Sequence, residues 1–507
     1  MIFIYNINNF YIKMFYLNSL IDSFYYFKYF IYFNIFLNSL FLNYCSSKLF
    51  NKYYFINYLY FSINLNGCFL IKLSQWINTQ LHAINYPDKT NSFIKIRELF
   101  DNFFENCQIH DINYTKKIFK NDTGYDLDDI IHLDTEYNIK SGSMAQVYKG
   151  KIKKNRCDKL ELCENDNNCE NDNIDIAIKV VHPEIKYQII FPEYLIYSYQ
   201  YFVKNYKCFK KYDNIFDFTS FIENLKLQFN MNNECKNMNY YYNYYNNIQK
   251  NDYIIIPKPL FSSKNILIME YIDGVLLDDI DVSENEKKKI CALFSLFVKD
   301  NYMFMDYFHN DIHNANWKII KTPDFYKLVI YDFGYIIKNN NKYNIRKLLY
   351  YFDTNDKVNC AKSIYNYLQN KYLDCNEFIE LFLKHVTKTL PYDDEFLFEI
   401  YTFLYINDFK MIDNLLEFFI LMVLIRKNLK KYFLQNKNIC NCKNSNNYHF
   451  ETYLFYKSII DKYNIFKNIG QYYDKEYFNN PEYLKLIEFK DDYLESLNNN
   501  DANNIDI

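Results

Sequence analysis

The hydrophobic and polar positions of this chain predict a strand-rich middle section flanked by helical segments. Short apolar runs of strand length occur at 147–149, 175–182, 253–261, 264–272 and 326–331. Apolar residues recur at helical spacing within 69–80, 214–247, 284–305, 378–386 and 415–429. Strands followed by helices indicate an α+β fold, with a sheet-rich lobe before a helical lobe.

A hinge between two lobes is predicted where the strand at 264–272 ends. The segment from Glu270 to Gly274 (EYIDG) is a short acidic turn, and helical periodicity resumes after it. An apolar strand, a short acidic turn and a helix in this order are typical of a connection between two lobes.

Residues 1–66 form an unusual N-terminal segment, dense in Phe, Tyr, Ile and Leu. The stretches 29–47 and 53–71 contain no charged residue, and each is about long enough to span a bilayer. Both also contain several Asn and Tyr residues, which are unusual in a spanning helix. The segment is therefore a set of aromatic-rich helices packed on the folded body, a membrane anchor, or part of a targeting leader.

Composition limits the classes of protein that the chain can belong to. Its 507 residues carry a net charge of −3, so no strongly basic face is implied and nucleic acid is not expected as a partner. The 13 cysteines are scattered and odd in number, which indicates a reduced compartment. Cysteine groups at 157–169 and 440–442 lack the ligand spacing of closed zinc sites.

The strongest chemical signal lies between Phe304 and Ile336. Asp311 is followed five positions later by Asn316, and Asp332-Phe-Gly follows the predicted strand at 326–331. This is the layout of a kinase catalytic loop and a metal-binding Asp-Phe-Gly segment. We expect Asp311 to orient the attacking hydroxyl or water, and Asn316 and Asp332 to hold Mg²⁺.

Candidate phosphate-binding residues precede this segment in the order that kinases use. Lys179 lies within an apolar strand, where a lysine is costly unless it meets an anion. It fits the strand lysine that grips the α/β-phosphates of ATP, and Glu234 is the candidate helix carboxylate that pairs with it. A solvent-facing edge-strand lysine is the alternative. The remaining candidate nucleotide contacts are Ser141, Gly142, Ser143, Met144 and Ala145 in a small-residue turn, and Glu270 and Ile272 in the hinge.

Several of these segments resemble one atypical kinase family, the UbiB/ADCK (aarF-domain) kinases. The loop FHNDIHNAN resembles the family's FHADPHPGN, with matches at His309, Asp311, His313 and Asn316. SGSMAQVYKG resembles its Ala-rich nucleotide loop, LIMEYIDG its hinge, and IAIKVVHPEI its VAVKVQHPGI strand, which places Lys179, His182 and Pro183.

Two further signatures of the family have counterparts in this chain. KLSQW matches the N-terminal K-x-G-Q signature at Lys72 and Gln75, with Ser74 in place of the glycine. QFNMNNECKN matches the segment that carries the E-x-D signature, but Gln228 and Asn230 replace both acids. Amides keep hydrogen-bonding capacity and lose two negative charges, so the family's use of these carboxylates is in doubt here.

The resemblance implies a bilobed protein-kinase-like fold with an N-terminal helical extension and a helical C-terminal lobe. It implies that the K-x-G-Q helix packs over the active site and obstructs protein substrates, which gives Lys72, Gln75, Gln228 and Asn230 regulatory roles. The expected domains are 1–66, 67–139 (the extension), 140–272 (the N-lobe, with a low-complexity insertion at 154–174), 273–490 (the C-lobe) and 491–507 (an acidic Asn-rich tail).

The implied activity is that of an ATPase or small-molecule kinase with ATP and Mg²⁺ as cofactors, linked to coenzyme Q or prenyl-lipid metabolism. The resemblance places it at a mitochondrial membrane, or alternatively in a plastid, with quinone-pathway molecules and proteins as partners. The loss of both E-x-D carboxylates favours an alternative, a pseudokinase that binds nucleotide as a scaffold with little turnover.

Overall fold

The computed structural model describes the two lobes and most of the N-terminal extension. The described residues are 20–50, 53–83, 109–134, 139–153, 173–206, 218–248, 253–283, 305–312, 316–323, 326–339 and 356–387, with isolated positions within 286–301, 348–351 and 399–409. The cysteine groups, His313, the insertion core 154–172, the predicted helix at 415–429 and the tail lie outside them.

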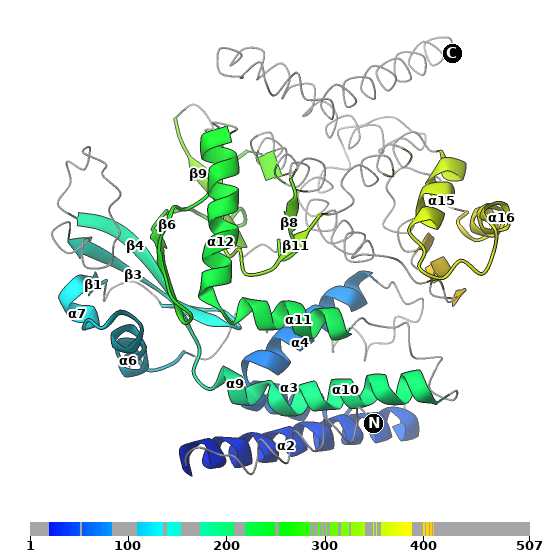
Figure 1. Cartoon of the computed structure of the whole chain (residues 1–507), viewed down its shortest axis with the longest axis horizontal. Helices are drawn as coiled ribbons and strands as arrows, with labels where there is room; N and C mark the ends of the chain where they lie inside the picture. Colours follow the sequence, from blue (N-terminus) through cyan, green and yellow to red (C-terminus); the bar gives the residue numbers. More distant parts are fainter. Residues whose placement is uncertain are drawn as a thin grey trace, which may run out of the picture.

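The N-lobe is built on one sheet with the strand order β1-β3-β4-β7-β6, and β2 pairs with the start of β3 (Figure 1). The strands are β1 (Ile131–Leu133), β2 (Lys140–Ser141), β3 (Ala145–Lys153), β4 (Asn173–Val181), β6 (Pro259–Ser262) and β7 (Ile266–Glu270). All pairings are antiparallel. Because β1 belongs to this sheet, the N-lobe begins before the boundary predicted at 140.

Strand β4 separates two hydrophobic cores. Ile176 and Ile178 pack with helices α6 (Ile112–Thr123) and α7 (Leu127–Ile130), whereas Ala177 packs on the other side with α12 (Met231–Tyr242). Successive side chains of a strand point to opposite faces. Lys179 therefore faces α12, as the rest of the site requires.

Helix α12 crosses one face of the sheet (Figure 1). The helix predicted at 214–247 is broken before it, because α11 (Phe218–Gln228) ends and Asn230 begins α12 as its N-cap, accepting a hydrogen bond from the backbone N–H of Asn232. α12 continues into a π-helical turn (Asn243–Ile248), and the side chains of Tyr241 and Tyr245 are fully buried. This Tyr/Asn-rich run is thus part of the core.

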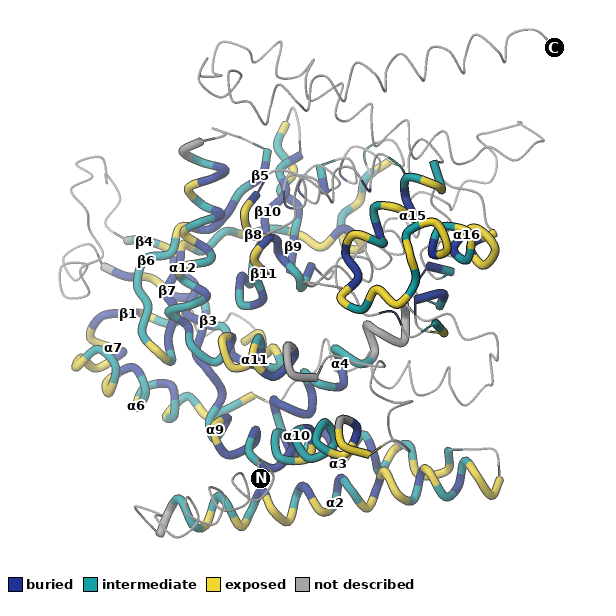
Figure 2. The backbone as a smooth tube through the Cα atoms, turned by 45° about the vertical axis from the view of Figure 1, so that its right-hand side comes forward, coloured by how far each residue is buried: buried dark blue, intermediate teal, exposed yellow. Residues whose placement is uncertain are grey.

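The described helices of the N-terminal segment are α2 (Leu20–Phe50) and α3 (Ile56–Asn66), and the extension begins with α4 (Cys68–Ala83). α2 packs against α3, α9 (Ile185–Gln188) and α10 (Ile190–Asn205). Exposed residues recur along the length of α2 (Figure 2). They include the large apolar residues Phe24, Phe27, Phe41, Leu49 and Phe50. Among the described helices, none has the length and apolarity that crossing a membrane requires.

The turn between β4 and α9 binds α2 to the N-lobe through side-chain hydrogen bonds. Glu184 has φ +66°, a left-handed conformation that costs a non-glycine residue roughly 1 kcal/mol. Its carboxylate accepts hydrogen bonds from the Lys28 ammonium and the Tyr29 hydroxyl, each at 2.7 Å. Gln188 donates to the same tyrosine hydroxyl at 3.1 Å and accepts from the backbone N–H of Cys68 at 2.7 Å.

The junction between α3 and α4 needs a glycine. Gly67 has φ +82°, and a Cβ there would lie 2.6 Å from the Gln188 side chain. Because Gln188 also holds Tyr29, this close approach joins α2, α4 and α9 at one point.

The C-lobe contains two small sheets and a helical part. One sheet has the order β5 (Ile254–Ile255), β10 (Tyr326–Ile330), β9 (Trp317–Lys321), and the other pairs β8 (Tyr307–His309) with β11 (Ile336–Lys338). The described helices of this lobe include α15 (Lys357–Asn366) and α16 (Cys375–His385). α16 corresponds to the helix predicted at 378–386, and it begins with a capping box at Asp374. The predicted α+β class is confirmed.

Replacing Tyr29 by Phe should weaken the attachment of α2. The change removes a hydroxyl that donates to Glu184 and accepts from Gln188, so the free energy of unfolding should fall by about 1 kcal/mol. Urea unfolding checks this. Tyr32→Phe is the matched control, because its hydroxyl has no hydrogen-bond partner among the described residues. Equal effects of both changes would contradict the role of Glu184.

Candidate active site

The centre of the site is a lysine held between two carboxylates. The Lys179 ammonium on β4 lies 2.7 Å from Glu234 Oε1 on α12 and 3.0 Å from Asp332 Oδ1. The side chains of Lys179 and Glu234 are buried, whereas Asp332 is 42% exposed. The strand lysine and helix carboxylate predicted from the sequence therefore meet, and the Asp-Phe-Gly carboxylate joins them.

Burial and neighbouring charges shift the pKa values of Glu234, Asp332 and Lys179 in different ways. Burial raises the pKa of Glu234 to about 7, against the attraction of Lys179, and the nearby Asp332 carboxylate raises it further. Burial also works against ionisation of Asp332, but the ammonium groups of Lys179 and Lys72 bring its pKa well below its usual range. The two carboxylates in turn raise the pKa of Lys179 above its ordinary value, against desolvation.

The Asp-Phe-Gly segment has a defined conformation. Asp332 has φ +55°, and its Oδ1 accepts a hydrogen bond from the backbone N–H of Gly334 at 3.2 Å. A Cβ at Gly334 would lie 3.2 Å from that same oxygen, so the glycine allows this turn. Phe333 is fully buried, 4.9 Å from the Tyr241 ring, and its carbonyl accepts from Asn237 on α12 at 2.9 Å.

The catalytic-loop residues are tied to one another and to the Asp-Phe-Gly segment. The Asn316 side-chain amide donates to the Asp311 carbonyl at 2.7 Å. The Tyr331 backbone N–H donates to the Asn316 carbonyl at 2.8 Å, which places Asn316 beside the residue before Asp332. Carboxylate and amide oxygens are hard ligands suited to Mg²⁺, which usually completes its coordination with water and phosphate oxygens.

The loop rests on a buried histidine. His309 Nδ1 accepts a hydrogen bond from the Asp311 backbone N–H at 3.2 Å, and its ring lies 5.3 Å from Phe333. Asn301 accepts from both the Tyr241 hydroxyl and the His309 backbone N–H. His309 therefore joins the catalytic loop, the Asp-Phe-Gly segment and α12.

A second lysine, from the N-terminal extension, covers the catalytic aspartate. The Lys72 ammonium on α4 lies 2.5 Å from Asp311 Oδ2. The neighbouring Gln75 is buried, and Trp76 packs on Phe221 of α11 with ring centroids 4.8 Å apart. The structure places this helix against the candidate active site, as the family resemblance implies.

The nucleotide-loop candidates form a tight turn before β3. The Gly142 backbone N–H donates to the Ala145 carbonyl at 3.0 Å, and the Met144 carbonyl accepts from the backbone N–H of His182 at 3.0 Å. Ser141 belongs to β2, and Ser143 lines a cavity behind the turn. The loop is therefore ordered by its own backbone and by the residue that ends β4.

The hinge candidates offer backbone atoms more than side chains. The exposed Glu270 carboxylate accepts a hydrogen bond from the Lys258 backbone N–H at 3.3 Å. Glu270 ends β7 and Lys258 precedes β6, so this bond joins the ends of two neighbouring strands. The Ile272 carbonyl accepts from the Tyr331 hydroxyl at 2.9 Å, which ties the hinge to the strand before Asp332.

Comparison with known proteins agrees with this geometry. Residues 168–364 match the ABC1 atypical kinase-like domain. This part of the chain is therefore similar to the ABC1 atypical kinase-like domain. The family resemblance predicted from the sequence is thereby confirmed.

Two curated proteins resemble part of the chain. The ABC1 family protein MCP2 of Saccharomyces cerevisiae is 24% identical over 208 residues, which is 40% of this chain and 34% of that protein. The probable serine/threonine-protein kinase abkB of Dictyostelium discoideum is 26% identical over 225 residues, which is 41% of this chain and 29% of that protein. The chain thus spans about a third of the length of each relative.

Two solved structures show a distant likeness. Rv3197 of Mycobacterium tuberculosis, in complex with erythromycin, has a TM-score of 0.39 at 14% identity and covers 54% of this chain and 66% of its own. The Rio2 kinase of Chaetomium thermophilum, with ADP/Mg²⁺ and phosphoaspartate, has a TM-score of 0.27 at 9% identity and covers 71% of this chain and 96% of its own.

The chain departs from the pattern of the kinase family that it resembles next to the Asp-Phe-Gly segment. Gln228 ends α11 and is buried, and its Cγ lies 3.8 Å from the place that a Cβ on Gly334 would take. Asn230 serves as the N-cap of α12. Gln228 therefore lies beside the Asp-Phe-Gly segment and Asn230 holds the start of α12, and neither amide carries the negative charge of the family's acid.

Some residues that support the candidate site were not predicted from the sequence. Asn237 and Tyr241 of α12 hold the Asp-Phe-Gly segment and the loop, but they lie in an Asn/Tyr-rich run. The available signal was helical spacing: Asn237 follows Glu234 by three positions and so shares its helix face. Asn301 carried no local signal.

Glu234→Gln should flatten the pH dependence of stability. The raised pKa means that folded Glu234 keeps a proton that the unfolded chain releases above its ordinary pKa of about 4.5. This contribution is complete below the unfolded pKa and is lost as pH rises through about 7. Wild type should lose on the order of 2 kcal/mol of unfolding free energy between pH 5 and pH 8 that the variant retains.

Urea unfolding at the two pH values measures this difference. Glu193→Gln, which removes a carboxylate paired with Lys226 outside the site, is the control and should keep the wild-type slope. A Glu234→Gln variant with the wild-type slope would show that Glu234 is ionised throughout this range.

Proposed function

We propose that this chain is an ATP-dependent enzyme, an ATPase or a small-molecule or lipid kinase, that supports coenzyme Q or other prenyl-lipid metabolism. The observation that carries the proposal is the placement of Lys179 between Glu234 and Asp332, beside the Asp311–Asn316 loop. Phosphoryl transfer depends on positioning and charge neutralisation, which these groups supply.

Each residue has a distinct role in the proposed reaction. Mg²⁺, when bound with ATP, neutralises charge that develops on the phosphates. Asp332 and Asn316 would hold the ion, and Lys179, fixed by Glu234, would bind the α/β-phosphates. Asp311 would orient the attacking hydroxyl or water and accept its proton.

The proposed acceptor is a small molecule and not a protein. Lys72 and α4 cover Asp311, which leaves little room for a docked polypeptide. No Ala-Pro-Glu sequence follows Asp332-Phe-Gly, so the usual activation segment for protein substrates is missing from the sequence. Both features favour an acceptor that reaches the loop beside α4.

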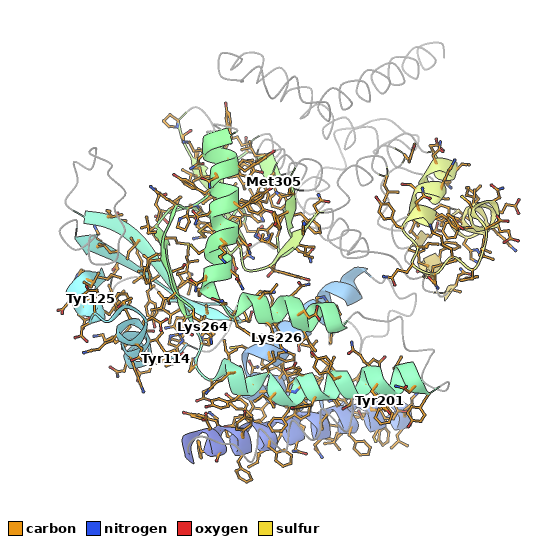
Figure 3. The ribbon with its side chains drawn as sticks, viewed as in Figure 1. Tyr114, Tyr125, Tyr201, Lys226, Lys264 and Met305 are labelled. Atoms are coloured by element: carbon orange, nitrogen blue, oxygen red, sulfur yellow. The ribbon has the colours of Figure 1, made fainter. Side chains whose placement is uncertain are left out.

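A large cavity supports a lipid-like ligand. It has a volume of about 1110 Å³, is open on one side, and is lined by residues of α2, α4, α6 and α9 and by Ser143 of the nucleotide loop. Figure 3 marks Tyr114, Lys226 and Lys264 on elements around it. Its wall is mainly apolar and aromatic, as in pockets for small organic ligands.

The polar groups of the cavity suit a quinone or phenol. Lys117 and Lys264 have no ion-pair partner among the described residues, and the Tyr114 hydroxyl has no hydrogen-bond partner there. Burial raises the pKa of Tyr114 to about 12, which keeps it a donor. The ligand that we propose is a prenyl-lipid or quinone-pathway molecule, which agrees with a mitochondrial or plastid location.

The exposed apolar side of α2 adds support for association with a membrane surface, where aromatic side chains are favoured. Proteins of quinone biosynthesis are the proposed protein partners. These assignments follow from the proposed pathway.

A pseudokinase is the second candidate. Gln228 and Asn230 remove two carboxylates near Asp332, and Lys72 pairs with Asp311. Such a protein would bind Mg²⁺ and nucleotide without turnover.

Hydrolysis assays separate the two candidates. Wild type should hydrolyse ATP in the presence of Mg²⁺, and Asp332→Asn should reduce turnover at least about a hundredfold because a charged metal ligand is lost. Lys72→Met should increase turnover, because it frees the Asp311 carboxylate. Measurements with and without lipid vesicles cover the membrane case. Binding of Mg²⁺ and nucleotide without hydrolysis in wild type and Lys72→Met would establish the pseudokinase.

A bulky residue in the cavity tests the proposed ligand. Ile118→Trp on α6 should weaken binding of a short-chain prenyl quinone about tenfold, because the indole fills space that the ligand needs. Equilibrium dialysis measures the affinity. Tyr125→Trp, at an exposed position just beyond α6, is the control. Unchanged affinity in a folded Ile118→Trp protein would exclude this cavity.

A further inference from the structure

A chain of hydrogen bonds between buried and half-buried side chains runs from β3 to the nucleotide loop. His182 Nε2 lies 2.9 Å from the Gly142 carbonyl oxygen, and its Nδ1 lies 2.9 Å from Nδ1 of His110. His110 Nε2 lies 2.9 Å from Thr115 Oγ1, which in turn lies 2.7 Å from the Tyr148 hydroxyl.

The carbonyl at one end fixes the direction of the first two hydrogen bonds. A carbonyl oxygen only accepts, so His182 Nε2 must carry a hydrogen and donate it to Gly142. Burial lowers the pKa of His182, so its ring is neutral at pH 7 and its Nδ1 is an acceptor. His110 must therefore carry its hydrogen on Nδ1 and donate it to His182.

The remaining bonds follow the same direction. Desolvation, together with the neighbouring His182, lowers the pKa of His110 to about 4, so the ring is neutral and Nε2 accepts from the Thr115 hydroxyl. That hydroxyl has no second hydrogen, so it accepts from the Tyr148 hydroxyl. Every ring nitrogen in the chain thus has a single assignment.

The position of His110 is itself fixed by β3. The side chain of Gln146 is fully buried; its Oε1 accepts from the His110 backbone N–H at 2.8 Å. Its amide nitrogen donates to the His110 carbonyl at 3.2 Å and to the Tyr148 hydroxyl at 2.5 Å. Gln146 thus binds both the backbone N–H and the backbone carbonyl of His110, which holds the backbone of His110 where its imidazole reaches His182.

We propose that His110 is a positioning residue for the nucleotide loop, acting through a donated hydrogen bond that orients His182 toward the Gly142 carbonyl. His110 lies outside the 168–364 region that matches the ABC1 domain, in the segment that leads into α6. The inference rests on the proposed nucleotide site, and it adds to that site a contribution from the N-terminal extension.

An anchor at Gly142 matters because the orientation of this peptide affects whether the loop can bind phosphate. Backbone N–H groups attract phosphate and carbonyl oxygens repel it, so a loop that binds phosphate must keep its carbonyls turned away. His182 engages the loop twice, through its side chain to Gly142 and through its backbone N–H to the Met144 carbonyl. A freely rotating His182 would leave the Gly142 peptide free to turn.

Two substitutions of His110 separate the bond to His182 from the bond to Thr115. The Asn amide nitrogen reaches about the place of imidazole Nδ1, so His110→Asn keeps the donor to His182 and loses the contact with Thr115. The Gln amide reaches about the place of Nε2, so His110→Gln does the reverse. Both variants remove the ring, and thermal unfolding of both checks that each is folded.

Hydrogen exchange of residues 141–145 tests the anchor without nucleotide. His110→Gln should raise exchange of these amides about tenfold, whereas His110→Asn should stay near wild type. The affinity for ADP with Mg²⁺, measured by calorimetry, should fall about tenfold in His110→Gln only. A loss shared equally by both folded variants, or by neither, would overturn the proposal.

The tautomers give a second readout that does not depend on nucleotide. Nitrogen NMR of histidine-labelled protein at pH 7 should show His110 protonated at Nδ1 and His182 protonated at Nε2, assigned with the His110 variants. His110 protonated at Nε2 would overturn the inference. Wild type that binds no nucleotide, but shows these tautomers and the exchange difference, would reject the proposed function while keeping the anchor.

Discussion

The buried pair of Lys179 and Glu234 is the interaction on which the site depends. Removing one partner of such a pair typically costs 3–5 kcal/mol, since it leaves an uncompensated charge in the core. The pair fixes how α12 sits on β4, and α12 in turn holds Phe333 through Asn237 and the catalytic loop through Tyr241. One ion pair thereby sets the positions of elements from both lobes.

A second lysine–carboxylate pair connects the N-terminal extension to the same centre. Lys72 binds Asp311 directly and also lowers the pKa of Asp332, so the extension contributes to the charge balance of the site. Two lysines balance three carboxylates, and the family's two further acids are replaced here by Gln228 and Asn230. The amides limit the excess negative charge that the site must hold before a cation binds.

The sequence predicted those site residues that stand in a recognisable local pattern. Lys179 was found because a strand lysine among apolar residues needs an anion, and Asp311, Asn316 and Asp332 were found by ordered spacing. The partner of Lys72 could not be found from local pattern, since helical periodicity does not tell which element, 239 positions away, lies opposite. The break at Asn230 was missed because helical spacing of apolar residues does not reveal an N-cap within the segment.

The left-handed turn at Asp332 has a consequence for how the site responds to ions. Its carboxylate already serves the Lys179 ammonium, and the two pairings with Lys179 and with the Gly334 amide use the same oxygen, Oδ1. The second oxygen, Oδ2, is the one that would meet a divalent cation in the proposed site. Such a cation would share the Asp332 carboxylate with the Lys179 ammonium, whose other counter-charge is Glu234. Metal and nucleotide binding would then be linked through this one carboxylate.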